Sequence, residues 1–411
     1  MNKRRIIPIF VIVFTNILGS GVIIPILPLV AEGEFGATVF QATLLLAVFF
    51  GAQFLAAPWL GRLSDRVGRR PVLIVSQIGT VISFIMFALA TPLGQFFDKN
   101  IEFGISGGLL ILYLARTLDG ITGGNITTAQ AYMSDISTEE NRAQALGTIS
   151  AAFGLGFIFG PALGALLAGI SLTAPFIGAA IISAGSVLLT IFMLKESLPP
   201  EARVKTNAGD KQTSAYAFLR IPTIFMIFMI TFVITLAFSS LQSTLALYTD
   251  RVIYPDTNDP VQVARLVGLL LTIVGIASVI TQGFLIRPLV KKYGERTLVV
   301  IGQTSLLAGF IVLALATSPV LMLLIAPFIA FGSGVNQPSL QSLITRFGSR
   351  QDQGQLLGLY QSARSFALIL GPIWAGYAFQ QIGPRAPYAI AVPIVAISLI
   401  LSIVLKRQSP S

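Results

Sequence analysis

The sequence predicts an all-α membrane protein with 12 transmembrane helices in two six-helix bundles and with both termini in the cytoplasm. Three observations favour this fold class: an apolar composition, a series of apolar runs of membrane-spanning length, and a repeat that relates the two halves of the chain. Of the 411 residues, 54% are apolar or aromatic and 11% are charged, and the mean hydropathy is +0.83. Soluble domains are roughly 45–50% apolar and ~25% charged, so this composition excludes a soluble globular protein.

Each predicted helix is an apolar run of about 20 residues, the length that crosses a bilayer. In the N-terminal bundle, residues 1–194, the runs lie at 6–30, 40–60, 72–92, 108–131, 143–168 and 175–194. In the C-terminal bundle, residues 221–411, they lie at 221–248, 265–286, 297–316, 321–345, 355–380 and 387–405. Residues 195–220 are rich in charge, Pro, Ser and Thr, which predicts a cytoplasmic linker between the bundles.

The first run follows the basic segment MNKRR, as the apolar part of a signal peptide would. It is about 25 residues long, contains Pro25 and Pro28, and has no small-x-small cleavage site at its end. We therefore expect a retained first helix.

Lysine and arginine alternate between the loops and so predict the topology. With a cytoplasmic N-terminus, 21 of the 27 fall on the cytoplasmic side, and Arg116 and Arg364 lie inside spans. The remaining four, on the outer side, are Lys99, Arg251, Arg265 and Arg385. The net charge of +10 is thus a signal of topology rather than of nucleic-acid binding. The predicted environment is the lipid bilayer of a prokaryotic cytoplasmic (inner) membrane.

The sequence contains no cysteine and no histidine, which excludes disulfides, thiolate metal sites and imidazole proton shuttles. It also lacks a Gly-Lys nucleotide-binding loop. An intramembrane enzyme would need a constellation of catalytic groups that these spans do not offer. We therefore expect no catalytic residue, no metal and no cofactor, and a chemistry limited to carboxylates, amides, hydroxyls and arginines.

The two sets of six runs are related by an internal repeat. A shift of 211 residues superposes Gly123 on Gly334, Asn125 on Asn336, Gln130 on Gln341 and Gly160-Pro161 on Gly371-Pro372. Earlier in each half the shift is 226 residues, and Gly68 then matches Gly294. A duplicated six-helix unit is the architecture that lets two bundles rock about a site near the bilayer midplane, which is alternating access. The repeat therefore favours a transporter.

The segment between the second and third runs, GRLSDRVGRRP at residues 61–71, combines small residues with charges at fixed spacing. A small residue permits close helix approach, a carboxylate can pair with arginines or lie at a helix N-terminus, and a glycine can form the tight turn. The simple alternative is a basic cytoplasmic loop. We predict a conformational gate of eight residues: Gly61, Asp65, Arg66, Gly68, Arg69, Arg70, Asp135 and Arg142. The degenerate second copy, residues 287–296, has Lys291 in place of Asp65, so we expect the first half to supply most of this lock.

The fifth run contains GLGFIFGPALG, in which Gly156, Gly160, Pro161 and Gly164 form a small-residue stripe with a proline. Such a stripe predicts a closely packed, bendable helix at a helix–helix interface. Generic transmembrane packing is the alternative for a GxxxG pattern alone.

These motifs together resemble those of a known family. The 61–71 run looks like the signature loop of the major facilitator superfamily, and GxxxGPxxG resembles the motif of its antiporters. The segment NILGSGVIIPILP and the segments 53–73 and 114–137 are similar to the drug:proton antiporter branch, closest to the subgroup that contains the tetracycline exporters. The resemblance implies the 12-helix major facilitator fold, a monomer, and proton-coupled multidrug efflux that confers antibiotic resistance. Asn16 stands where those exporters have a carboxylate, and their second-half histidine has no counterpart here.

The fourth run contains two ionisable residues, Arg116 and Asp119, which are costly in a bilayer and functional by default. Helical spacing places them on one face with Gly123 and Gln130. We expect Asp119 to bind and release the coupling proton, with Arg116 favouring its charged form or competing with the proton. A static ion pair is the alternative.

The resemblance implies that helices 1, 4, 7 and 10 line the transport cavity. Amides on these helices and on helices 2 and 11 suit an amphipathic organic cargo, although each could equally join helices. Arg364 is a further candidate, either for an anionic group or as the partner of a carboxylate. The predicted cargo-binding residues are Asn16, Gln53, Asn125, Gln130, Gln242, Asn336, Gln337, Gln341, Gln361 and Arg364.

The function predicted from these features is export of small amphipathic compounds, possible cargo including tetracycline-like drugs, in exchange for protons. Two alternatives share the fold: a proton-coupled importer of a small polar nutrient, and a lipid or glycolipid flippase. An importer would have more charge in the cavity than these amides provide.

Overall fold

The computed structural model describes residues 3–100, 104–137, 142–199, 201, 215–257, 259–347 and 353–408. These residues form helices and turns and contain no strand. Nine of their helices are long and apolar enough to cross a membrane, or ten if the bent pair α1 and α2 is one span. The prediction of an all-α membrane protein is confirmed.

Two of the 12 predicted spans are not among these ten, each for a visible reason. The run 108–131 is divided between two shorter helices, α6 and α7. The run 355–380 lies in α15, Gln353–Gln381, whose apolar character is diluted by glutamines, serines and Arg364.

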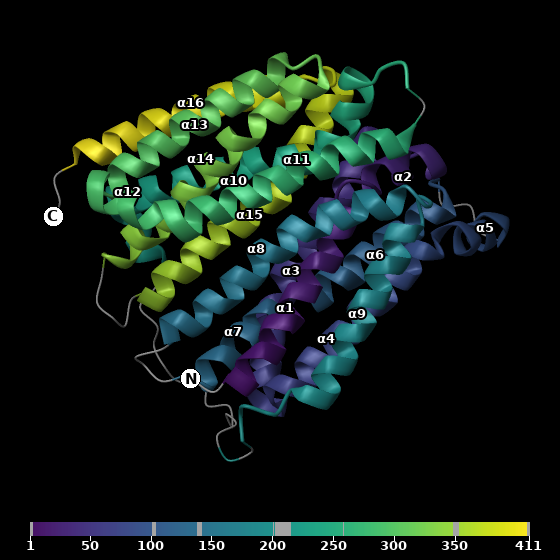
Figure 1. Ribbon diagram of the computed structural model, residues 1–411, viewed down its shortest axis with the longest axis horizontal. Coiled ribbons are helices and arrows are strands. Elements are labelled where there is room, and N and C mark those ends of the chain that lie inside the picture. The colour runs from purple at the N-terminus through teal and green to yellow at the C-terminus, as the bar shows by residue number, and fades with distance from the viewer. Residues whose placement is uncertain are drawn as a thin grey trace. The chain divides into compact units, whose positions relative to one another are not determined.

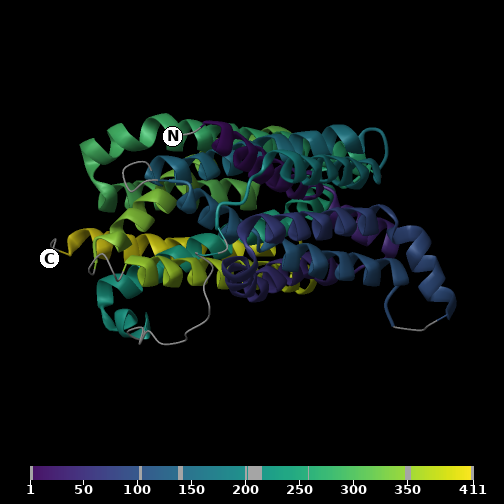
Figure 2. The ribbon, with the colours of Figure 1, turned by 90° about the horizontal axis from the view of Figure 1, so that it is seen from below.

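The helices pack into two units, and each has its own core (Figure 1). Among its described residues, the first unit contains nine α-helices and the segment Asp259–Thr272. These helices are α1 (Lys3–Ile23), α2 (Leu27–Phe35), α3 (Val39–Val67), α4 (Arg69–Ala88), α5 (Ala90–Asn100), α6 (Gly107–Gly123), α7 (Ile126–Asp135), α8 (Arg142–Ala168) and α9 (Ala174–Met193). Within this unit α1 packs against α8 and α9, and α3 packs against α6. The helix α5 protrudes beyond the ends of its neighbours (Figures 1 and 2).

The second unit contains most of the remaining chain. Its elements are η2 (Ala215–Arg220), α10 (Pro222–Tyr248), η3 (Thr249–Ile253), α11 (Pro260–Ile280), η4 (Thr281–Leu285), α12 (Ile286–Tyr293), α13 (Glu295–Leu315), α14 (Pro319–Thr345), α15 (Gln353–Gln381) and α16 (Ala386–Arg407). The first residues of α11 group with the first unit, and the rest of this helix groups with the second. In the second unit α10 packs against α15, and α13 packs against α14 and α16.

The first predicted span is bent. α1 ends at Ile23, and α2 begins at Leu27 after a turn that contains Pro25, with a 40° angle between the two helices. Proline lacks an N–H donor and clashes with the preceding turn, so the helix breaks where the sequence places Pro25 and Pro28.

The predicted gate segment is more helical than its composition indicates. α3 continues to Val67, and Gly68 alone separates it from α4, which begins at Arg69. Gly68 has φ of 109°, a conformation that residues with a side chain rarely adopt. Gly294 makes the equivalent one-residue junction between α12 and α13 with φ of 74°.

Both units have an apolar core and an apolar outer surface. Buried residues such as Ile9, Leu73 and Met133 form a core cluster in the first unit. Large apolar side chains are also exposed, among them Leu55 at 77% and Phe192 at 80%. Exposed apolar surface of this extent is expected where the neighbour is lipid rather than water.

Candidate functional site

The centre of the candidate site is a break in the fourth predicted span. α6 ends at Gly123, and α7 begins at Ile126, so Gly124 and Asn125 lie between the two helices. The break leaves the Gly123 carbonyl without a helical partner, and the side chain of Gln53 on α3 donates a hydrogen bond to it over 2.9 Å. A buried carbonyl without a partner would be costly, so Gln53 stabilises the break.

Close packing holds α6 against α3 at this level. A Cβ added at Gly120 would meet the backbone carbonyl of Phe49, and one at Gly124 would lie 3.2 Å from the backbone of Ala57. Glycine at these positions therefore permits the approach of the two helices.

Arg116 and Asp119 form a buried ion pair one turn above the break. Arg116 Nη1 lies 3.1 Å from Asp119 Oδ2, and the two side chains are only 3% and 2% exposed. The guanidinium also lies over two rings, 5.4 Å from the centroid of Phe49 and 5.1 Å from that of Phe87. Arg116 Nε has no hydrogen-bond partner among the residues that the structure describes. The pair neutralises two charges in an apolar layer but leaves part of the guanidinium unsatisfied.

The predicted polar face along span 4 is divided by the break. Arg116, Asp119 and Gly123 lie on α6 and are buried, whereas Gln130 lies on α7 and is exposed. Helical spacing predicts a common face only while the helix is continuous, and the Gly123-Gly124 pair ends it here.

Two predicted cargo-binding amides meet in the first unit. Asn16 on α1 and Asn125 at the break line one small cavity of about 10 Å³, together with Ile12 and Leu73. That volume corresponds to about one water molecule. Asn16 and Asn125 are the polar residues of a lining that is otherwise apolar.

The amides of the second unit differ in exposure. Asn336 on α14 is fully buried, and neither side-chain atom of its amide has a hydrogen-bond partner in the described part of the chain. Gln242 on α10 and Arg364 on α15 are partly buried. The exposed members of the predicted set are Gln337, Gln341 and Gln361.

The gate residues form an ion-pair cluster around Arg69. Its Nη1 lies 2.6 Å from Asp65 Oδ1 and its Nε lies 3.1 Å from Asp135 Oδ2. Ser64 Oγ accepts a further hydrogen bond from Nη1 over 2.6 Å. The cluster joins the end of α3, the start of α4 and the end of α7.

The other predicted gate residues lie around this cluster. Arg70 donates to the Ile191 carbonyl over 2.6 Å, and Arg66 is exposed. A Cβ added at Gly61 would meet nothing within 4 Å, so no close helix approach within the described residues requires this glycine. The side chain of Arg142 lies outside the described residues.

The small-residue stripe of α8 packs directly on α1. A Cβ at Gly156 would lie 2.8 Å from the side chain of Ile17, and one at Gly160 would lie 2.8 Å from the Cα of Gly21. A Cβ at Gly164 would meet the carbonyl of Val22. Pro161 lies inside α8 and is buried beside Gly21.

Sequence reasoning missed Glu196, at the start of the predicted linker. Its carboxylate accepts hydrogen bonds from the backbone N–H groups of Arg69 and Arg70 over 2.9 and 3.1 Å. The neighbouring Ser197 donates to Asp135 over 2.9 Å. A search for the group that satisfies the free N–H donors of α4 could have found Glu196.

A second missed pair lies in the second unit. Arg346 Nη2, at the end of α14, lies 2.8 Å from Oε2 of Glu295, the first residue of α13. Ser342 donates to Glu295 Oε1 over 2.6 Å. The repeat contained the signal, because shifts of 226 and 211 residues align Glu295 with Arg69 and Arg346 with Asp135.

The fold and the site define a class: a multi-pass membrane protein with two helical units, each with an ion pair at a helix junction, as expected of a secondary transporter. The chain belongs to the Major Facilitator Superfamily, whose family model matches residues 9–264 and 252–411. It is a multi-pass protein of the bacterial inner membrane.

Named relatives place the chain within that family. The class C tetracycline resistance protein of Escherichia coli is 33% identical over 376 residues, covering 90% of this chain and 89% of that protein. Multidrug resistance protein 2 of Bacillus subtilis (strain 168) is 29% identical over 421 residues, covering 99% and 97%. The crystal structure of the human organic anion transporter MFSD10 (TETRAN) shares the fold, with a TM-score of 0.68 and 23% identity over 97% of this chain and 99% of that chain. The predicted family and its likeness to tetracycline exporters are confirmed.

Proposed function

We propose that this protein exports small amphipathic organic compounds across the inner membrane in exchange for protons. The relatives that span nearly the whole chain are resistance proteins for tetracycline and for multiple drugs, which supports efflux. The observation that supports proton coupling is Asp119, a carboxylate buried in α6 with Arg116 as its ion-pair partner.

In the proposed cycle, Asp119 exchanges its proton when the site opens to one side of the membrane. The carboxylate pairs with Arg116 while it is ionised, as in the structure described here. Protonation removes the negative charge and releases the guanidinium, which then lies between the Phe49 and Phe87 rings without a counter-ion. Because α6 ends at Gly123, the released charge lies about one turn from the break at residues 123–125, where the span is not a continuous helix.

The cargo surface proposed in the first unit is the pair of amides Asn16 and Asn125. They line a cavity that is otherwise formed by apolar side chains, and the cavity borders the helix break. Amides amid apolar side chains suit a ligand that needs a few hydrogen bonds and much apolar contact.

The test uses everted membrane vesicles with an imposed pH gradient and a panel of amphipathic drugs that includes tetracycline. We expect some compounds to dissipate the gradient with the natural sequence, and Asp119→Asn to abolish this response. Asp256→Asn is the matched control, because Asp256 is an exposed carboxylate far from α6 in sequence.

A double variant separates the proton role from a structural one. Arg116→Gln with Asp119→Asn leaves no unpaired buried charge, so it preserves folding better than Asp119→Asn alone. If the double variant inserts normally and retains gradient-driven transport, the pair is static and the proposed role of Asp119 is wrong. If no compound affects any variant in tight vesicles, the importer and flippase functions gain support instead.

A further inference from the structure

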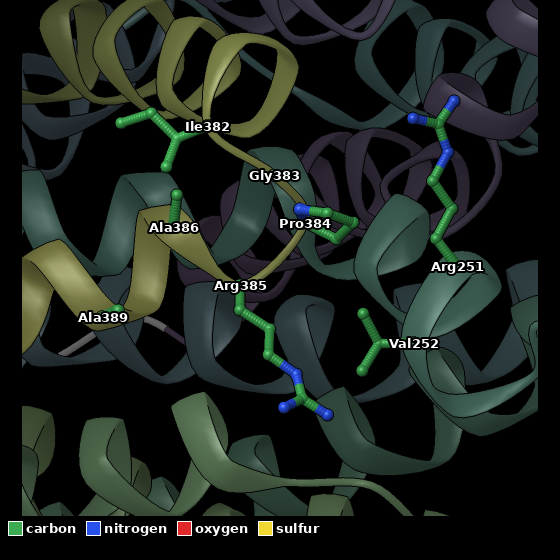
Figure 3. Close-up of a pocket in the computed structure, with 8 residues that line it drawn as sticks. All are labelled: Arg251, Val252, Ile382, Gly383, Pro384, Arg385, Ala386 and Ala389. Atoms are coloured by element: carbon green, nitrogen blue, oxygen red, sulfur yellow. The ribbon is translucent and has the colours of Figure 1, made fainter.

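The second unit contains an open hollow where η3 faces the turn between α15 and α16 (Figure 3). Its volume is about 590 Å³, and it is a shallow, widely open site rather than an enclosed cleft. We call it the outer hollow. It is lined by Arg251, Val252, Ile382, Gly383, Pro384, Arg385, Ala386 and Ala389.

Charge distinguishes this hollow from the rest of the outer side. Arg251 and Arg385 are two of the four basic residues that the topology assigns to that side. Basic residues are depleted there, since orientation in the membrane is set by their excess in the cytoplasmic loops. Half of the few exceptions therefore line a single hollow.

The two arginines differ in their helical surroundings, because Arg251 lies in the last turn of η3, where a positive charge is favoured, and Arg385 lies at a helix N-terminus, where it is not. Arg385 is the N-cap residue of α16, whose first turn contains no acidic residue. The N-terminal end of a helix already has a partial positive charge, so a cation there is unfavourable unless an anion is close. Arg251 belongs to the short π-helix η3, and π-helical turns are frequent at functional sites.

The two arginines are positioned independently. Arg251 Cζ lies 5.6 Å from the ring centroid of Phe379, and the guanidinium interacts electrostatically with the carboxylate of the adjacent Asp250. Figure 3 shows Val252 and Pro384 between the two arginine side chains, which extend in different directions. The charges therefore flank the hollow, an arrangement that suits a large anionic group rather than a single small ion.

The backbone N–H groups at the start of α16 are already used in local hydrogen bonds and are not available to an anion. The Ala386 N–H donates to the Gly383 carbonyl over 3.0 Å, and the Tyr388 N–H donates to the Arg385 carbonyl over 3.2 Å. Pro387 between them has no N–H. An anion would thus be bound by guanidinium groups, which prefer phosphate and carboxylate oxygens.

The rest of the lining is apolar and ranges from the exposed Ile382 and Ala389 to the buried Ala386. Ile382 is 72% exposed, and Val252, Pro384, Ala386 and Ala389 contribute further apolar surface. The hollow lies where predicted spans end at the outer side, the level at which lipid headgroups meet acyl chains. Apolar surface beside two guanidiniums matches an amphipathic anion that is present at this level.

We propose that the outer hollow binds the phosphate headgroup of an anionic phospholipid from the outer leaflet. The guanidiniums of Arg251 and Arg385 contact the headgroup oxygens, and Ile382 contacts the upper acyl chain. This proposal does not depend on the cargo or on proton coupling.

The test measures lipid binding by the purified full-length protein with native mass spectrometry. Phosphatidylglycerol is titrated, and zwitterionic phosphatidylcholine serves as the reference lipid. We expect phosphatidylglycerol to bind in preference, and Arg251→Gln with Arg385→Gln to weaken its binding about tenfold or more, because each substitution removes a charge-assisted hydrogen bond. Arg385→Lys keeps the charge and should retain part of the preference.

The matched controls are Arg265→Gln and Lys99→Gln, the other two basic residues of the outer side, which do not line the hollow. We expect both to bind phosphatidylglycerol as the natural sequence does. The proposal is overturned if the double arginine variant, shown by size-exclusion chromatography to be folded, keeps the full preference. It is also overturned if inorganic phosphate displaces the lipid at equal concentration, which would indicate a small-anion site instead.

Discussion

The two halves of the repeat differ in structure at a segment where their sequences align. A shift of 211 residues places Gly123-Gly124-Asn125 opposite Gly334-Val335-Asn336. The first triplet interrupts its span between α6 and α7, whereas α14 runs unbroken from Pro319 to Thr345. Glycine disfavours a helix by about 1 kcal/mol relative to alanine and valine by somewhat less, so the Gly-Gly pair weakens its helix more than the Gly-Val pair does. The two triplets differ in one residue, Gly124 against Val335, and the Gln53 hydrogen bond further stabilises the break in the first.

The ionisable residues follow the same division. The positions opposite Arg116 and Asp119 are Pro327 and Ala330, so the second half has no counterpart of the buried ion pair. The first half thus combines a buried charge pair with an interrupted helix, and the second half combines an apolar span with a continuous one. Both halves share the helical architecture, and we infer that only the first half has acquired the buried ion pair.

At the cytoplasmic junctions the two halves instead have the same pair with opposite polarity. The first helix residue after the junction glycine is Arg69 in one half and Glu295 in the other, and their partners are Asp135 and Arg346. A carboxylate at a helix N-terminus is favoured by the helix dipole, and a guanidinium is not. At the N-terminus of α4, where Arg69 is unfavourable, two further carboxylates supply negative charge: Asp65 and Glu196.

The largest effect is expected from breaking the buried pair on one side. Asp119→Asn leaves the Arg116 charge without a counter-ion in a site that is 3% exposed, which should cost about 3–5 kcal/mol of stability. Thermal unfolding of the detergent-purified protein measures this loss. Arg116→Gln with Asp119→Asn should recover most of it. Equal destabilisation by the single and double variants would contradict the charge argument and indicate a packing effect.

A smaller effect is expected from changing the residue at which the two aligned triplets differ, Val335 in α14 or Gly124 at the break. Val335→Gly should destabilise α14 by about 2–4 kcal/mol, because it removes a fully buried side chain and adds a flexible residue. Hydrogen exchange of amides 334–340 should accelerate. Gly124→Val should slow exchange at the start of α7 but cost about 1–3 kcal/mol through overpacking against Leu60 and Ala57.

The control for this pair is Gly185→Val, since a Cβ at Gly185 meets nothing within 4 Å and the residue lies inside α9. If Gly124→Val and Gly185→Val have the same effects on hydrogen exchange and stability, the Gly123-Gly124 pair is not what interrupts the helix.

Reversing the polarity of each cytoplasmic pair should affect the two halves unequally. Arg69→Glu with Asp135→Arg places a carboxylate beside Asp65 and Glu196 and should cost about 1–3 kcal/mol. Glu295→Arg with Arg346→Glu changes a pair whose arginine is 65% exposed, and solvent screening limits the cost to about 0–1 kcal/mol. Unfolding midpoints in matched detergent compare the two reversals. Equal costs would show that Asp65 and Glu196 do not define the polarity of the first half.

Much of the fold was predictable because its causes are local. Apolar runs predicted the spans, and Gly68 with its counterpart Gly294 predicted the helix junctions. The bend between α1 and α2 was not predicted, although Pro25 lies in it. The break at Gly124 was missed because apolar runs do not distinguish a helix from an interrupted one. Its stability depends on Gln53, a donor 70 residues away in sequence.

The candidate site was predicted by residue type rather than by arrangement. An Arg and an Asp three residues apart in one span predicted the ion pair, but their spacing contains no information on Phe49 and Phe87 beside the guanidinium. Glu295 was overlooked because the second copy of the gate motif was compared at position 65 rather than at position 69. Glu196 was assigned to the linker by composition, although its carboxylate belongs to the N-terminus of α4.

The smallest effect is expected from Glu196→Gln, which tests whether the extra carboxylate serves the Arg69 junction. One side-chain oxygen of glutamine can still accept from the Arg69 N–H, but the amide nitrogen cannot accept from Arg70, and the favourable charge at the helix terminus is lost. The expected cost is about 1 kcal/mol, with faster hydrogen exchange at the amides of residues 69 and 70. Glu201→Gln, an exposed carboxylate in the same linker, should change neither. Unchanged exchange at both amides in Glu196→Gln would mean that Asp65 and Asp135 balance the charge of Arg69 without help from the linker. The junctions at Gly68 and Gly294 would then differ only in which partner of the ion pair begins the helix.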